Sequence, residues 1–250
     1  MSENKKIVIV GATSSIAEHC ARLWIQQPNV ELVLVGRNKN KTQQIADDLR
    51  VRNPQTVIQV IETNFIDLTA IQQTVQHIAS QGDIDTVLIA HGSLPDQTAC
   101  QQDLTLCQDA LNINGISPVL FAEAFANVMQ KSNKGTLAII GSVAGDRGRK
   151  SNYVYGSAKG MVTRYAQGLQ HRLANTNVKT LLIKPGPTDT PMTAHLKQQG
   201  TKLAKVDDVA KQIVNGINKE KLIIYAPGKW ALIMLIIRHL PRFIFNKINI

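Results

Sequence analysis

Tyr155 and Lys159 are the residues of this 250-residue chain whose types and spacing first suggest chemistry. On a helix, a separation of four positions places two side chains on one face, so the phenol and the amine would point into the same space. A phenol can donate a proton to a developing alkoxide, but its free pKa of about 10 is high for exchange at neutral pH. We expect the Lys159 ammonium to favour the phenolate and so to lower the pKa of Tyr155. Such a pair also occurs on ordinary exposed helices, so other residues of the chain are needed to show whether this pair is catalytic.

Short apolar runs alternate with longer amphipathic segments along the chain. The runs are β-branched and almost continuously hydrophobic, which is typical of strands buried on both faces. Strand and helix alternate throughout, and this favours a parallel sheet with helices on both sides. We predict an α/β fold with one doubly wound domain and a seven-stranded parallel sheet. The predicted strands are residues 6–10, 31–36, 56–61, 85–91, 135–141, 178–184 and 221–227, and the predicted helices are about 15–26, 38–52, 68–80, 101–130, 154–174 and 206–218.

Ser142 follows the fifth predicted strand and so stands at the carboxyl edge of the sheet, where doubly wound folds bind ligands. Asn114 lies inside the long helix predicted before that strand. The polar segment 188–204 interrupts the strand–helix alternation and is interpreted either as a mobile lid beside the site or as an inert surface excursion.

The first predicted strand is followed by "GATSSIAEH" and then by a helix. Small residues in such a turn let backbone N–H groups approach a pyrophosphate, and the helix N-terminus adds partial positive charge. The predicted phosphate-binding residues are Gly11, Thr13, Ser14, Ser15 and Ile16.

The second predicted strand ends at Gly36 and Arg37. An acidic residue here would bind the ribose 2′-hydroxyl of NAD, whereas a guanidinium suits the 2′-phosphate of NADP. Arg37 therefore predicts NADP(H) in preference to NAD, against the alternative that it is a solvated arginine at a helix start.

The chain resembles the short-chain dehydrogenase/reductase family over nearly its whole length. The family's site residues are matched in order and spacing by Asn114, Ser142, Tyr155 and Lys159. The resemblance implies a Rossmann domain and an NAD(P)-dependent oxidoreductase that uses no metal. It also implies roles for single residues: Tyr155 gives the proton, Lys159 also holds the nicotinamide ribose, Ser142 positions the substrate oxygen, and Asn114 holds water in a proton relay.

Further cofactor contacts follow from the same resemblance. "KPGPTDTP" is similar to the family segment that contacts the nicotinamide end. The chain departs from the family pattern at Ser15 and Ala17, which replace glycines, at His91, and at Asn64, where an aspartate is common. The implied contacts are Asn64, Phe65, Ala90, His91, Gly92, Pro185, Gly186 and Thr188.

Composition and charge limit the classes of molecule that the protein could bind. The net charge is +10, and residues 219–250 hold six basic residues against one acid, which suggests an anionic partner. Nucleic acid would leave the site residues without a role. Three cysteines without metal-like spacing indicate reduced thiols, and no signal peptide is visible, so we expect a cytoplasmic protein. The basic loop at Arg147, Arg149 and Lys150 is interpreted as a phosphate contact or as a solvated loop.

The domain is predicted to cover residues 1–228, with a basic, apolar extension at 229–250. Its longest apolar run, residues 230–237, cannot span a bilayer, but such a segment can lie on the inner face of the cell membrane. The alternative is a subunit contact, and we expect a homodimer or homotetramer.

The stretches "NYVYGSAKG", "MTAHLK", "YAP" and "LIIRHLPRFIFNKI" together resemble those of a narrower group, the reductase subunit of decaprenylphosphoryl-ribose 2-epimerase. This resemblance implies a polyprenyl-phosphoryl 2-keto-pentose as substrate, a flavin oxidase as partner and a role in cell-envelope polysaccharide synthesis. The alternatives are a soluble ketoreductase for fatty-acyl or small hydroxy/keto substrates, and a non-catalytic NADP-sensing scaffold.

Overall fold

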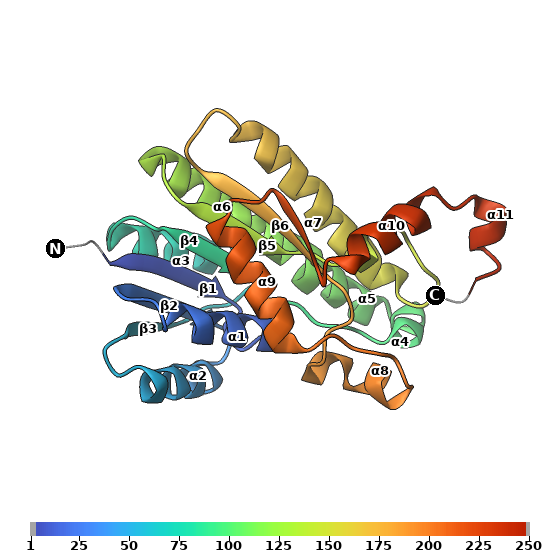
Figure 1. Cartoon of the computed structure of the whole chain (residues 1–250), viewed down its shortest axis with the longest axis horizontal. Helices are drawn as coiled ribbons and strands as arrows, with labels where there is room; N and C mark the ends of the chain where they lie inside the picture. Colours follow the sequence, from blue (N-terminus) through green and yellow to red (C-terminus); the bar gives the residue numbers. More distant parts are fainter. Residues whose placement is uncertain (1–3, 249–250) are drawn as a thin grey trace.

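Seven parallel strands form the centre of the molecule in a computed structural model that describes residues 4–248 (Figure 1). Their order in the sheet is β3-β2-β1-β4-β5-β6-β7, so the chain winds outward from β1 in both directions. The predicted seven-stranded, doubly wound sheet is therefore confirmed. The strands are β1 (Lys5–Val10), β2 (Val30–Gly36), β3 (Val57–Glu62), β4 (Thr86–Ile89), β5 (Thr136–Ile140), β6 (Lys179–Pro185) and β7 (Ile223–Ala226).

Helices cover both faces of this sheet (Figure 1). Alternate residues of a strand point to opposite faces, so Ile7 and Ile9 pack under α1 (Ser15–Trp24), α2 (Lys39–Arg52) and α9 (Val206–Asn218). Val8 and Val10 pack under the other layer, α3 (Leu68–Ser80), α6 (Ser117–Ser132) and α7 (Tyr153–Arg172). Two hydrophobic cores thus pack against the two faces of the sheet.

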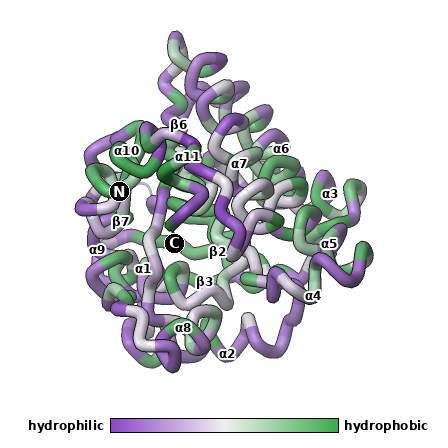
Figure 2. Tube along the Cα trace, turned by 90° about the vertical axis from the view of Figure 1, so that its right-hand side faces the viewer, coloured by the Kyte–Doolittle hydropathy of each residue, from purple (hydrophilic) through white to green (hydrophobic). Residues whose placement is uncertain are grey.

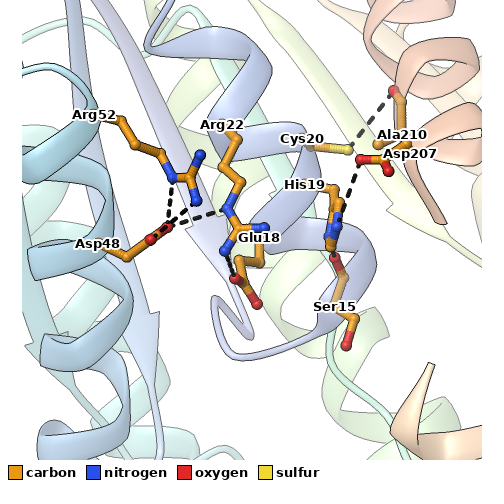
Figure 3. A network of polar contacts seen from close by, with 9 residues as sticks. All are labelled: Ser15, Glu18, His19, Cys20, Arg22, Asp48, Arg52, Asp207 and Ala210. Carbon is orange, nitrogen blue, oxygen red and sulfur yellow. Dashed lines mark hydrogen bonds and ion pairs between the residues drawn. The ribbon is translucent and has the colours of Figure 1, made fainter.

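Polar contacts fix α1 between its two neighbours (Figure 3). Arg22 pairs with Glu18 on its own helix and with Asp48 of α2, whose carboxylate also binds Arg52 at 2.9 Å. On the other side, the His19 ring lies 3.6 Å from Asp207 of α9. These partly exposed contacts link α1 to α2 and α9, while its buried side chains Ala17, Cys20 and Trp24 hold it against the sheet.

The helix predicted over residues 101–130 is interrupted. The chain forms α4 (Gln97–Gln102), α5 (Leu104–Leu111), a π-helical turn η1 (Asn112–Ile116) and then α6. Asp103 ends α4 and caps α5 by accepting from two backbone N–H groups. Gly115 lies against Ala158 of α7, where an added Cβ would come within 3.3 Å, so close packing accompanies the wider turn.

The remaining segments lie near the carboxyl edge and at the C-terminus. They are η2 (Val143–Gly145), η3 (Pro191–Thr193), α8 (Ala194–Gln198), α10 (Lys229–His239) and α11 (Arg242–Phe245). Pro241 separates the last two helices, as its missing N–H leads one to expect. Across residues 4–248, no helix combines the length and hydrophobicity needed to cross a membrane. The predicted extension begins at α10, and the outermost parts of both predicted regions, residues 1–3 and 249–250, lie outside the described residues.

Candidate active site

Tyr155 and Lys159 share one face of α7 and line the same cavity at the carboxyl edge of the sheet. The Lys159 ammonium lies 5.9 Å from the centre of the Tyr155 ring and donates a hydrogen bond to the carbonyl of Ile140 at 3.1 Å. Ser142 lines the cavity as well. It follows β5 directly, and its hydroxyl accepts from the backbone N–H of Ala144 at 3.1 Å. Three of the predicted residues therefore surround one space.

The electrostatics of Tyr155 differ from the sequence expectation. Burial raises the pKa of Tyr155, and the lowering contributions come from hydrogen bonding with Ser142 and from the charge of Arg149. Burial also lowers the pKa of Lys159 to about 8, so this amine is still largely protonated at neutral pH. The expected lowering of the Tyr155 pKa is not found, because burial of the phenol outweighs the nearby charges, and spacing along a helix does not reveal that burial.

Asn114 reaches the same region from the π-turn. Its Oδ1 accepts from the backbone N–H of Ser93 at 2.8 Å, and its amide donates to the carbonyl of Ala110 at 2.9 Å. A Cβ at Gly92 would lie 2.8 Å from the Asn114 oxygen and 3.5 Å from the Lys159 ammonium. Gly92 therefore leaves room for these two side chains to approach the backbone from the same side.

A second cavity adjoins the first and is formed by the predicted phosphate-binding turn. Gly11 has φ +85°, and a Cβ there would lie 2.6 Å from the backbone nitrogen of His91, so both conformation and space require glycine. Ser14 precedes α1, and its side chain makes no capping hydrogen bond. The residues of this cavity include Gly11, Thr13, Ser14, Ser15, Ile16, Gly36, Arg37, Asn38, Lys41, Phe65, His91 and Gly92.

These residues fit the phosphates of a dinucleotide. A positive-φ glycine turn, free hydroxyls and a helix N-terminus are donors that suit a pyrophosphate. Arg37 lies 5.9 Å above the Phe65 ring, and Lys41 lines the same cavity. None of the residues named as lining it is acidic.

Two predicted contacts have a different local setting. Asn64 lines a neighbouring cavity with Arg37 and Glu62, and its oxygen accepts from the N–H of Ile66. The buried His91 ring packs 4.6 Å from Phe65, and its Nε2 lies 2.8 Å from the Ser117 hydroxyl. Burial above all lowers the pKa of His91 to about 3, so the ring is neutral at ordinary pH.

The predicted nicotinamide segment after β6 lines the first cavity through Pro185, Gly186 and Thr188. Thr188 donates to the carbonyl of Gly186 at 2.9 Å. A Cβ at Gly186 would lie 1.9 Å from the indole nitrogen of Trp230, so α10 packs directly on this segment. Ala90 and Gly92 border the first cavity from the end of β4.

Sequence reasoning missed a buried network beneath this loop. Asp146 forms an ion pair with Lys184 and accepts from the Tyr225 hydroxyl at 2.8 Å. Lys184 and Asp146 are 4% and 2% exposed, and they join the loop after β5 to β6. The signal was present in part, since Asp146 is the only acid in the basic loop. Its two partners, by contrast, stand in apolar strands with no local sign of pairing.

Comparisons with known proteins identify the family. The model of the family described as short chain dehydrogenase matches residues 5–201. An uncharacterized oxidoreductase of Mycobacterium tuberculosis is 30% identical over 249 residues, which covers 96% of each chain. The chain belongs to the short-chain dehydrogenase family. A second relative, an uncharacterized oxidoreductase of Staphylococcus aureus, is 28% identical over 220 residues, 87% of this chain and 93% of that one.

Solved short-chain dehydrogenases have the same fold. One from Sphingobium yanoikuyae, in complex with NADPH, superposes with a TM-score of 0.82 at 19% identity, over 98% of this chain and 96% of that one. The 3-oxoacyl-[acyl-carrier protein] reductase of Brucella melitensis, in complex with NAD, gives 0.80 at 18% identity, over 93% and 99%. Family membership makes this chain an NAD(P)-dependent oxidoreductase.

Proposed function

We propose that the protein is an NADP(H)-dependent reductase of a keto-sugar, with a polyprenyl-phosphoryl 2-keto-pentose as its substrate. The observation that carries the reductase proposal is the meeting of Ser142, Tyr155 and Lys159 in one cavity, next to the basic cavity of the Gly11 turn. The first cavity suits a carbonyl compound, and the second suits a phosphorylated dinucleotide.

The proposed roles follow from these positions. The reduced nicotinamide, when bound, supplies a hydride to the carbonyl carbon. Ser142 donates a hydrogen bond to the carbonyl oxygen, and Tyr155 gives its proton to that oxygen as negative charge develops. Lys159 is proposed to hold the ribose, and Asn114 to position water that returns a proton toward Lys159. Replacing Tyr155 by phenylalanine should cost at least about 10²-fold in kcat, because the proton donor is lost while the ring remains.

The proposed preference for NADP(H) depends on the cations after β2. Arg37 and Lys41 line the cavity in which a ribose 2′-substituent would lie, and a guanidinium binds phosphate through two parallel hydrogen bonds. A 2′-hydroxyl would instead call for a carboxylate acceptor at this place.

The surface of the C-terminal helices supports a lipid-linked substrate. Figure 2 shows α10 as a strongly hydrophobic segment at the edge of the molecule. Its outer side chains are Leu232, Leu235 and Ile236, which are 63%, 53% and 56% exposed, and Phe243 of α11 is 70% exposed. The basic residues of the two helices and their flanks are Lys229, Arg238, Arg242 and Lys247. Apolar side chains next to cations suit the interface of an anionic membrane.

The position of α10 links this surface to the cavity, since Trp230 packs on Gly186 at the cavity wall. A substrate held in a membrane by its prenyl chain would thus reach the site beside the helices that contact the membrane. We propose that a flavin oxidase supplies the keto-sugar, because a reductase of this class needs an oxidised sugar from an earlier step.

Subunit association is also proposed. Exposed apolar side chains of α5, η1 and α7 suit a homodimer or homotetramer, and light scattering on the purified protein would measure its mass. These side chains are Leu104, Leu106, Ile116 and Met161.

Two measurements test the proposal. NADPH consumption should follow addition of the 2-keto product of a polyprenyl-phosphoryl-ribose oxidase, and Tyr155→Phe should slow it by at least about 10²-fold. Turnover of a water-soluble 3-oxoacyl thioester with none of the lipid-linked ketone would favour the soluble ketoreductase. Unchanged cellular function of Tyr155→Phe would favour the scaffold.

The second measurement is flotation with vesicles that contain anionic phospholipid. The wild-type protein should float, and the triple variant Leu232→Ser, Leu235→Ser, Ile236→Ser should not. Val51→Ser is the matched control, because Val51 is 84% exposed on α2, away from the C-terminal helices. Wild-type protein that stays in solution would contradict membrane contact.

A further inference from the structure

Arg149 lies in the loop between β5 and α7 and lines the cavity that holds Ser142 and Tyr155. Its Nε is covered and has no hydrogen-bond partner, and no ion pair of Arg149 is found within residues 4–248. Asn152 lines the same cavity, and its Oδ1 is likewise buried without a partner. The cavity wall thus offers one cationic donor and one acceptor that the protein itself leaves unused.

The neighbours of Arg149 are committed elsewhere. Arg147 donates to the carbonyls of Ile237 and Leu240, and its guanidinium lies 3.7 Å from the centre of the Phe245 ring. Arg147 therefore fastens the C-terminal helices, and the predicted phosphate contact does not extend to it. Asp146, the only carboxylate of the loop, is held by Lys184. No acid of the loop remains for Arg149.

A partly buried guanidinium without a counter-ion is unfavourable, because desolvation is not offset by an ion pair or a full set of hydrogen bonds. Burial lowers the pKa of Arg149, and the charge is close enough to lower that of Tyr155. An anionic group on the ligand would supply the missing partner at the place where the unpaired nitrogen lies. A guanidinium that binds a ligand is expected to lack a protein counter-ion, whereas one that stabilises the fold is expected to have one.

We propose that Arg149 binds the phosphoryl group of the keto-sugar substrate and that the Asn152 oxygen accepts a hydrogen bond from a hydroxyl of the same sugar. This inference rests on the proposed function and assigns it a subsite. One guanidinium matches the single negative charge of a phosphodiester, as in a lipid-linked sugar, and also accepts a phosphate monoester.

The test is isothermal titration of NADP⁺-saturated protein, so that the phosphate sites of the cofactor cavity are occupied. The probes are ribulose 5-phosphate, uncharged ribulose and a farnesyl-phosphoryl pentose. Arg149→Gln is compared with Lys150→Gln, which removes an exposed cation one position along the loop. Wild-type protein and Lys150→Gln should bind the phosphorylated probes more tightly than ribulose. Arg149→Gln should reduce that preference by about 10- to 100-fold, the worth of one charge-assisted hydrogen bond.

The outcomes separate the inference from the function it rests on. A preference that survives Arg149→Gln, or no preference in the wild type, would overturn the subsite. Equal loss in Lys150→Gln would show a general effect of surface charge and would also overturn it. Stronger binding of the farnesyl diester than of ribulose 5-phosphate indicates a lipid-linked source, and the reverse indicates a free sugar phosphate. Failure of the proposed function would appear differently, as absence of NADPH consumption with every ketone while Arg149-dependent binding persists.

Discussion

The ion pair between Asp146 and Lys184 leads to the sharpest stability prediction. Asp146→Asn keeps the shape of the side chain but removes its charge, so the Lys184 ammonium stays buried without a carboxylate. Because both side chains are almost fully enclosed, at 2% and 4% exposure, water cannot replace the lost partner. Breaking a buried pair in this way costs about 3–5 kcal/mol. For a chain of this size that corresponds to a fall in Tm of about 6–20 °C.

Urea unfolding followed by tryptophan fluorescence measures this loss. Lys184→Met in the Asp146→Asn background should recover most of it, because an apolar side chain needs no counter-ion. Asp189→Asn is the matched control. It breaks the exposed pair with Lys197, whose side chains are 44% and 63% exposed, and it should change stability by less than about 1 kcal/mol. A loss below about 1 kcal/mol in Asp146→Asn, or no recovery in the double variant, would refute the reasoning.

Three further predictions concern the cofactor cavity and the C-terminal helices. Arg37→Glu should lower the ratio of kcat/KM for NADPH to that for NADH by about 10²-fold or more, as measured by initial rates. Unfolded His91 takes up a proton near pH 6.5, whereas the folded pKa is about 3, so stability is lost as pH falls between these values. From pH 6.5 to pH 5 wild-type protein should lose about 1.6 kcal/mol more than His91→Phe in urea unfolding. Gly186→Ala should displace Trp230 and expose α10 to proteolysis. Adding Trp230→Ala to this variant should restore resistance, because the clash is removed. A digestion pattern of Gly186→Ala that equals the wild-type pattern would contradict this contact.

Local sequence patterns predicted most of the fold. Continuous β-branched runs separated by helix-length segments leave a parallel sheet as the economical arrangement, and every predicted strand lies within a strand of the structure or overlaps one. The glycine turn was equally readable, because a positive φ at Gly11 is a property of one residue and its neighbours. Tyr155 and Lys159 share a helix, so helical periodicity alone brings them to one face.

The π-turn at Asn114 is a feature that the sequence pattern did not predict. The amphipathic pattern of residues 101–130 is that of one helix, but packing of Gly115 on Ala158 of α7 goes with a wider turn. Such a contact joins segments far apart in the chain, and periodicity cannot reveal it.

The sequence by itself determined the alternation of elements, the glycine turn and the order of the site residues, because these depend on spacing along one chain segment. Tertiary structure alone decided how burial acts on the pKa of Tyr155, which arginine binds the C-terminal helices and which one lines the cavity. Arg147 and Arg149 are two residues apart and look equivalent in the sequence. They differ because Arg147 donates to backbone carbonyls at the C-terminal end of α10, whereas Arg149 lines the cavity. The burial and the pairing of a charged side chain depend on neighbours from elsewhere in the fold.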